Sequence, residues 1–272
     1  MGNAHGFVWV FPSPSGPWYI VKGALGGLLL LGVPGLILDQ LVAQPGIGFA
    51  ELCLWVVAFR YLPTSIAHLA RLAKMSRTQA ARVCNNLVAL GWMVLKGSAR
   101  RLRPVPLIPH ACQKEMASIL QEEYEMAPNR GEFLMKRHLD LLIHSDDYVD
   151  NARPRFLKNP MTTHPLEYDR YYRQKIAFEF NGTQHHEVTP AYPSDKALQR
   201  TQTRDTLKRG LSDTAGVRLI VITPDDLDAR ILLGLIPPDL PRNPIDAHGP
   251  YYTALAEMSA VYRARAAQAA NP

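Results

Sequence analysis

The chain has 272 residues, of which 47% are hydrophobic and 20% are charged, as in an ordinary globular protein. This length is more than one small core usually needs, so we expect two domains. The three cysteines share no metal-ligand spacing and are odd in number, which argues against a cysteine-based metal site and favours a reducing, cytoplasmic compartment. The formal net charge of +6 favours partners that carry negative charge.

Residues 1–45 are predicted to form an N-terminal arm that contains an apolar segment. The prolines between Pro12 and Pro17 indicate an irregular start over residues 1–19. The apolar segment, Ala24 to Leu38, is uncharged but only 15 residues long, whereas a membrane-spanning helix needs roughly 20 residues. We therefore expect a buried hairpin or helix there and no membrane partner, with a membrane-binding or partner-binding segment as the alternative.

Residues 46–127 carry basic charge with little acidic charge to balance it. Between Leu52 and Lys114 there is no Asp or Glu. The basic residues of this stretch are Arg60, Arg71, Lys74, Arg77, Arg82, Lys96, Arg100, Arg101, Arg103 and Lys114. A surface of one charge sign attracts phosphate, from nucleic acid or from an acidic membrane.

The same stretch is predicted to hold three helices, a strand hairpin and a linker helix. The expected helices cover residues 49–61, 63–73, 76–90 and 110–126, and the expected strands cover residues 92–95 and 102–108. Ser76 and Gln79 have the spacing of a capping box at the start of the third helix. Ala80, Val83 and Leu87 then fall on one face of that helix, so they are predicted to face the core.

This order of elements resembles a winged helix-turn-helix domain, over about residues 48–108. Similar domains lay the capped helix in the major groove of DNA. The positions that match the capped helix and the wing are Ser76, Arg77, Thr78, Arg82, Asn85, Arg100, Arg101 and Arg103. The alternative is a three-helix dimerisation module with a solvated basic face.

Residues 128–272 are predicted to form the second domain. The expected elements, in chain order, are a helix over 132–143, a loop, strands over 166–171 and 176–181, a helix over 195–215, a strand over 217–222 and a helix over 251–270. Asp169 and Glu179 lie on consecutive strands joined by a tight turn, so they can meet across the sheet. Because two converging carboxylates repel each other unless a cation lies between them, the pair predicts a divalent metal, Mg²⁺ or Mn²⁺.

The stretch LEYDRYYRQKIAFEFNGTQHH, followed by QRTQTRDTLKRGLSDTAGVRLIVI, resembles the PD-(D/E)XK nuclease superfamily. The most similar branch contains very-short-patch-repair-like and Tn7-type endonucleases. The resemblance covers about residues 132–222 and implies a restriction-endonuclease-like αβββαβ core, so the chain is expected to be α/β in class and α+β overall. The catalytic positions that it implies are Glu132, Asp169, Glu179, Asn181, Gln184, His185, His186 and Lys208. The implied metal ligands are Asp169, Glu179 and the carbonyl of Phe180.

Several simpler interpretations stay open beside this one. Asn181 stands where the nuclease family has Lys, and Asn cannot supply a positive charge. The chain is therefore also compatible with a DNA-binding regulator or assembly subunit whose nuclease fold is inactive. Asp169 and Glu179 are equally compatible with cross-strand pairing to Arg or Lys. The remaining alternatives are a helical ion pair for Asp205 and Lys208 and a chance zinc-like pair for His186 and Glu187.

The sequence thus predicts a metal-dependent endonuclease that hydrolyses phosphodiester bonds in double-stranded DNA. The winged-helix domain would position the DNA and the second domain would cut it. A homodimer, or a protein partner that directs cleavage, stays open as a further expectation.

Overall fold

A computed structural model describes residues 8–13, 16–22, 28–31, 35–98, 102–145, 147–182 and 195–270. The chain divides into two compact units, Met1–Met116 and Ala117–Pro272, and each is described by itself. Helices and three small sheets occur together, so the protein is α+β, as predicted. The division falls eleven residues before the predicted boundary at 127/128, because the second half of α5 (His110–Met126) packs Leu120 and Tyr124 into the core of the second unit.

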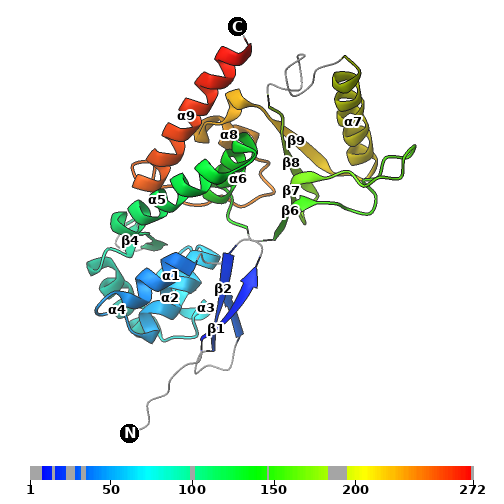
Figure 1. Cartoon of the computed structure of the whole chain (residues 1–272). Coiled ribbons are helices and arrows are strands. Elements are labelled where there is room, and N and C mark those ends of the chain that lie inside the picture. The colour runs from blue at the N-terminus through cyan, green and yellow to red at the C-terminus, as the bar shows by residue number, and fades with distance from the viewer. Residues whose placement is uncertain are drawn as a thin grey trace. The chain divides into compact units, whose positions relative to one another are not determined.

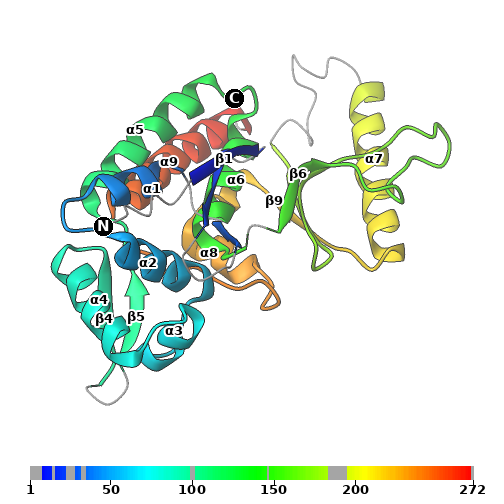
Figure 2. The same ribbon diagram turned by 90° about the horizontal axis from the view of Figure 1, so that it is seen from below.

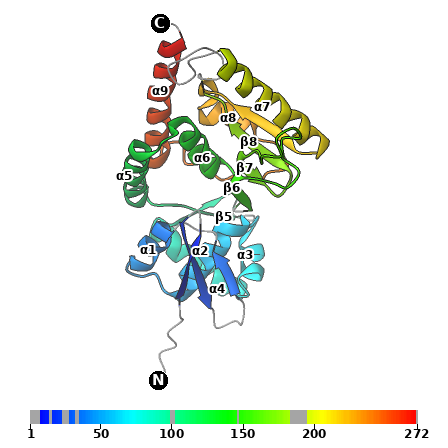
Figure 3. The ribbon, with the colours of Figure 1, turned by 45° about the vertical axis from the view of Figure 1, so that its right-hand side comes forward.

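The first unit begins with a three-stranded antiparallel sheet, where the sequence predicted an irregular arm over residues 1–19. Its strands are β1 (Val8–Ser13), β2 (Gly16–Lys22) and β3 (Leu28–Leu31), in the order β1-β2-β3 (Figure 3). The prediction gave too much weight to the prolines. Pro12 and Pro17 face each other beside the β1–β2 turn, whereas the valines and aromatic residues that precede and follow them favour strands.

The apolar segment continues from β3 into α1 (Gly35–Ala43), where Ile37 and Leu38 are buried, as the sequence predicted for a core segment. No single helix among the described residues is long and apolar enough to cross a membrane. One sharply bent pair of helices, α2 with α3, passes the same test of length and composition when the two are taken together.

The rest of the first unit has the predicted order of three helices and a strand pair. The elements are α2 (Phe49–Tyr61), α3 (Ile66–Leu72), α4 (Arg77–Ala89), β4 (Met93–Lys96) and β5 (Arg103–Pro106). Serine side chains start two of the helices: Ser65 accepts from the amide of His68, and Ser76 accepts from the amide of Gln79, both at 3.1 Å. These two hydrogen bonds fix where α3 and α4 begin.

Trp55 joins the strand pair to the helices of the first unit. Its indole ring is buried on α2 and lies edge-on to Trp92, with ring centroids 5.7 Å apart. Its Nε1 donates to the carbonyl of Trp92 at 2.7 Å and to that of Leu107 at 3.3 Å. One side chain thus satisfies its own polar group and holds both ends of the β4–β5 hairpin against the helical core.

The second unit holds a four-stranded sheet between helices. Its elements are α6 (Arg130–Leu142), β6 (Tyr148–Ala152), β7 (Tyr168–Tyr172), β8 (Ile176–Phe180), α7 (Asp195–Thr214), β9 (Arg218–Ile222), the 3₁₀ turn η2 (Pro224–Asp226), α8 (Ala229–Leu235) and α9 (Pro250–Ala270). The strand order is β6-β7-β8-β9, with β8 and β9 parallel and the other neighbours antiparallel. Strand β6 lies in the stretch predicted to be a loop, and α8 was not predicted.

The two faces of this sheet carry different cores. On β8, Ile176 and Phe178 pack with residues of α6, α8 and α9, whereas Ala177 between them packs with residues of α7. This alternation follows from the two-residue period of a strand. Figures 1 and 2 accordingly show α7 on one side of the sheet and α6, α8 and α9 on the other.

His138 on α6 makes the stability of the second unit depend on pH. Its ring is almost fully buried, its Nε2 lies 2.9 Å from the hydroxyl oxygen of Ser259, and burial lowers its pKa from 6.5 to about 4. The unfolded chain therefore takes up a proton near pH 6.5, whereas folded His138 does so only near pH 4. The contribution of neutral, buried His138 to the free energy of unfolding is complete above about pH 6.5, and it is lost as the pH falls toward 4.

We expect the free energy of unfolding of wild-type protein to fall by about 2 kcal/mol between pH 7 and pH 5 through this histidine alone. His138→Gln can keep a hydrogen bond to Ser259 but cannot titrate, so it should flatten that part of the profile. Urea unfolding of both proteins at several pH values measures the difference. Parallel pH profiles for the two proteins would contradict the assignment.

Candidate functional site

The β7–β8 hairpin brings two carboxylates to neighbouring strand ends. Lys175 adopts a positive φ of 58° in the turn, and the strands then pair with Arg170 opposite Phe178. Asp169 on β7 and Glu179 on β8 each lie one residue further from the turn than this pair. The amide of Phe180 donates to Oδ2 of Asp169 at 2.7 Å, which ties the two strands together at this point.

Helix α7 adds a lysine to the pair. Because β8 and β9 are parallel, the chain must cross over between them, and α7 is that crossover. Lys208 on this helix is buried, and its Nζ donates to Oε1 of Glu179. Burial raises the pKa of Glu179, and the Lys208 ammonium opposes that rise. The site therefore holds one carboxylate already paired with a cation.

Among the described residues, no cation forms an ion pair with Asp169 as Lys208 does with Glu179. Burial and the nearby charge of Glu179 hold the pKa of Asp169 well above its usual range, although the hydrogen bond from Phe180 lowers it. The charge of Glu132 acts in the same direction as that of Glu179. The charges of Glu179 and Glu132 thus both disfavour the ionised form of Asp169, and further positive charge would stabilise it.

Two oxygen atoms at this site are buried and have no hydrogen-bond partner among the described residues. They are Oε2 of Glu179 and Oδ1 of Asn181. An unpartnered buried acceptor costs about 1–3 kcal/mol unless something satisfies it. Both atoms, and the carboxylate of Asp169, are hard oxygen donors of the kind that Mg²⁺ and Mn²⁺ bind, so the residues present fit a divalent metal. The described residues contain no group of three or more His, Cys, Asp or Glu side chains around one metal position.

Glu132 lies at the start of α6 and is held by its neighbours. Nζ of Lys136 donates to Oε1 of Glu132 at 2.6 Å and to Oδ1 of Asn151 on β6 at 2.6 Å. The side-chain amide of Asn129 donates from Nδ2 to Oε2 of Glu132 at 3.2 Å. Glu132 therefore contributes negative charge near Asp169, while its own oxygens are occupied.

Some predicted positions lie outside the described residues. These are Gln184, His185, His186, Arg100 and Arg101. The described part of the predicted catalytic set, from Glu132 to Lys208, lies around the end of β8. The structure thus brings together Glu132, Asp169, Glu179, Asn181 and Lys208.

The predicted DNA-contacting residues of the first unit are exposed. Ser76, Arg77, Thr78, Arg82, Asn85 and Arg103 all project into solvent. The opposite face of α4 is buried through Ala80, Val83, Cys84 and Leu87, as the periodicity predicted. Asn86, the neighbour of Asn85, instead donates to the carbonyl of Gly46 and to Glu51, both at 3.1 Å. Asn85 is therefore the residue of this pair that is available to a ligand.

Two features near the site were not predicted. Lys136 could have been found, because it stands four residues after Glu132 on an expected helix. The close packing at Gly131 could not: a Cβ there would lie 2.1 Å from Cε1 of Phe180 and 2.5 Å from the hydroxyl of Tyr262. Phe180 and Tyr262 pack edge to face, with ring centroids 6.1 Å apart. The start of α6 can therefore approach the end of β8 only because residue 131 has no side chain.

The fold and site define an α+β protein with a carboxylate pair and a lysine at the end of neighbouring strands. The chain is 30% identical over 144 residues to "Uncharacterized protein 307L" of Invertebrate iridescent virus 6, a match that covers 47% of this chain and 71% of that protein. It is 34% identical over 96 residues to "Uncharacterized protein 033L" of Invertebrate iridescent virus 3, covering 35% of this chain and 48% of that protein.

The chain therefore belongs to the same protein family as 307L. No family model matches the chain, and no solved structure matches it.

Proposed function

We propose that this protein is a metal-dependent DNA endonuclease in which a winged helix-turn-helix positions the DNA and a PD-(D/E)XK-type core cuts it. The observation that carries the proposal is the convergence of Asp169, Glu179 and Lys208 from two strands and a crossover helix. One oxygen of Glu179 there is buried without a hydrogen-bond partner in the described part of the chain. A buried acidic cluster with one unsatisfied acceptor is costly in a structural role but suits a metal ligand set.

Each described residue has a distinct role in this proposal. Asp169 and Glu179, with the carbonyl of Phe180, would hold the metal and fix its position relative to the sheet. A bound divalent metal supplies positive charge to a phosphoryl oxygen and lowers the pKa of water. Asn181 would orient the attacked phosphate through its amide group. The reaction is hydrolysis of a phosphodiester by direct attack of water.

Lys208 can supply the positive charge that Asn181 cannot supply at the position of the family's lysine. Its ammonium reaches Glu179 from α7, so a positive charge is present at the place where the strand supplies none. With a divalent metal held by Glu179, the Lys208 ammonium could instead stabilise negative charge that develops on the scissile phosphate. We therefore infer that the cation of the site comes from the helix.

The Glu179–Lys208 pair also favours a second candidate, a DNA-binding regulator or assembly subunit with an inactive nuclease fold. If Lys208 neutralises the charge of Glu179 permanently, Glu179 does not need a metal. One assay separates the two: purified full-length protein is incubated with supercoiled and with linear double-stranded DNA, in Mg²⁺, in Mn²⁺ and in EDTA. The proposal expects strand cleavage in the metals and none in EDTA. Binding without cleavage in every metal would favour the inactive fold.

The first unit supports a separate prediction about sequence preference. Arg82 and Asn85 are exposed on α4, opposite its buried face, so they should reach base edges. Arg103 is exposed on β5, at the base of the wing, where its reach is to phosphate. Arg82→Ala and Asn85→Ala should change the preferred sequence, by about 1–3 kcal/mol for each lost bidentate contact. Arg103→Ala should weaken binding about equally on all sequences.

The measurement is binding of each variant to a randomised duplex library at several salt concentrations. Loss of one phosphate contact should reduce the slope of log affinity against log salt by about 0.9 for Arg103→Ala. An unchanged preference profile for both α4 variants would show that α4 does not read bases, and would favour the dimerisation module.

A further inference from the structure

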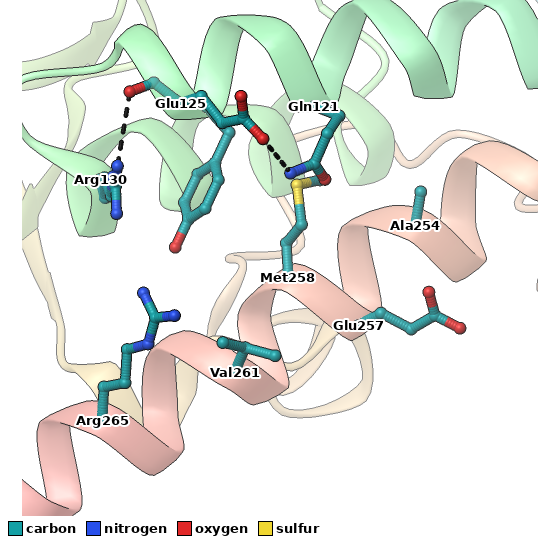
Figure 4. Close-up of a pocket in the computed structure, with 9 residues that line it drawn as sticks. Gln121, Glu125, Arg130, Ala254, Glu257, Met258, Val261 and Arg265 are labelled. Atoms are coloured by element: carbon teal, nitrogen blue, oxygen red, sulfur yellow. Dashed lines mark hydrogen bonds between the residues drawn. The ribbon is translucent and has the colours of Figure 1, made fainter.

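A pocket of the second unit lies between the C-terminal half of α5 and helix α9 (Figure 4). Its volume is about 590 Å³, within the range of roughly 300–1,000 Å³ that small-molecule sites occupy. The residues of α9 that line it include Met258 and Val261, which provide an apolar wall. None of its lining residues belongs to the carboxylate site described above.

One end of this pocket is basic. Arg130, at the start of α6, and Arg265, on α9, lie at the same end in Figure 4, while Glu257 lies at the other end. The guanidinium of Arg130 stands over the ring of Tyr124, 5.3 Å from its centroid, and donates to the carbonyl of Glu125 at 3.4 Å. Within the described part of the chain neither arginine forms an ion pair with a carboxylate. Two guanidinium groups at one end of the pocket favour an anion there.

Tyr124 gives an independent indication of a ligand. Its side chain is 7% exposed and lines the same pocket, and its buried hydroxyl has no hydrogen-bond partner among the described residues. The carboxylate of Glu125 is already occupied, because it accepts from the amide of Gln121 at 3.1 Å. The Tyr124 hydroxyl and the guanidinium groups of Arg130 and Arg265 can all donate hydrogen bonds, which an anion with several oxygens would accept.

We propose that this pocket binds a phosphate ester, with the phosphate at Arg130 and Arg265 and the rest of the ligand along the apolar wall of α9. Arginine suits this ligand because its planar group pairs with two phosphate oxygens at once. The phosphate can come from a free nucleotide or from the DNA backbone, and only the second source rests on the proposed nuclease function.

The pocket is connected to the carboxylate site through aromatic packing. Tyr262, next to Val261 on α9, packs against Phe180, which follows Glu179 on β8. A backbone phosphate held at Arg265 would therefore lie on the same helix whose Tyr262 packs against the end of β8. In that case, the pocket anchors the DNA strand that flanks the cut.

The test uses full-length protein in EDTA, so that its outcome does not depend on cleavage. The variants are Arg130→Gln and Arg265→Gln, and the charge-matched control is Arg155→Gln, an exposed arginine that does not line the pocket. The probes are inorganic phosphate, 2′-deoxyadenosine 5′-monophosphate and a 20-base-pair duplex, measured by calorimetry and fluorescence anisotropy. Melting temperatures of all variants verify that they fold.

The expected result is a loss of affinity of about tenfold for each pocket variant and little change for Arg155→Gln, since a charge-assisted contact is removed only in the former. A loss of affinity for the nucleotide identifies a small-molecule site. Loss for the duplex alone, with a salt slope reduced by about 0.9, identifies the DNA backbone as the source. Affinities of both pocket variants that match the control for every probe would overturn the proposal, even if the protein cleaves DNA.

Discussion

Glu179→Gln and Asp169→Asn should each reduce the rate of metal-dependent DNA cleavage by about a thousandfold or more. Both replacements keep the size of the side chain but remove the charge that would hold the metal. A metal contributes several kcal/mol to transition-state stabilisation, and each 1.36 kcal/mol corresponds to a tenfold change in rate. Single-turnover cleavage of a labelled duplex at saturating Mg²⁺ measures the effect, and duplex binding by both variants should stay close to wild type.

Glu167→Gln is the matched control for this prediction. Glu167 precedes β7 and accepts from the exposed guanidinium of Arg153 at 2.6 Å, and its charge is not among those that shift the pKa of Asp169. Glu167→Gln therefore removes the same charge from a carboxylate with a different partner. Its cleavage rate should remain within a few-fold of wild type. Wild-type rates for both Asp169→Asn and Glu179→Gln would remove these residues from the mechanism.

Arg170→Met should lower the free energy of unfolding by about 3 kcal/mol or more. Arg170 is 1% exposed and pairs with Asp150 on β6 and with Asp140 on α6, with its closest oxygen contacts at 2.6 Å. Its guanidinium also lies 3.9 Å from the ring centroid of Tyr148. Methionine fills a similar volume but removes the cation from Asp150 and leaves Asp140 with Arg137 alone, at 3.1 Å. Breaking a buried ion pair on one side costs about 3–5 kcal/mol. Urea denaturation at neutral pH measures the loss.

Arg153→Met provides the comparison, because Arg153 pairs with Glu167 while its own side chain is 64% exposed. An exposed pair of this kind contributes about 0–1 kcal/mol. Equal losses of stability for the two variants would contradict the structural role of Arg170. A loss of stability confined to Arg170→Met, with cleavage retained by the folded protein, would show that Arg170 supports the sheet and takes no part in cleavage.

Local signals in the sequence were sufficient for much of the fold. Ser76 marked the start of α4, and the apolar period identified which face is buried. The hairpin that joins β7 and β8 was evident from its turn, so Asp169 and Glu179 could be placed on neighbouring strands. These features depend on residues that are close in sequence, which a single chain reveals directly.

Features that depend on distant residues were not predictable in the same way. The β1–β2 pair was missed because prolines suggested an irregular arm, although they stand beside the turn, where pairing tolerates them. The ion pairs of Arg170 join β7 to α6 and β6, and no pattern in the sequence indicates these contacts. The division between the two compact units falls earlier than the predicted boundary because α5 contributes residues to both cores.

The most direct test of this account is whether the pair of Asp169 and Glu179 binds a divalent metal. Mn²⁺ binding to full-length protein without DNA can be followed by electron paramagnetic resonance, for wild type, Asp169→Asn and Glu167→Gln. We expect saturable Mn²⁺ binding by wild type and by Glu167→Gln, displaced by excess Mg²⁺, and loss of that binding in Asp169→Asn. Equal Mn²⁺ binding by all three proteins, or none by wild type, would contradict it.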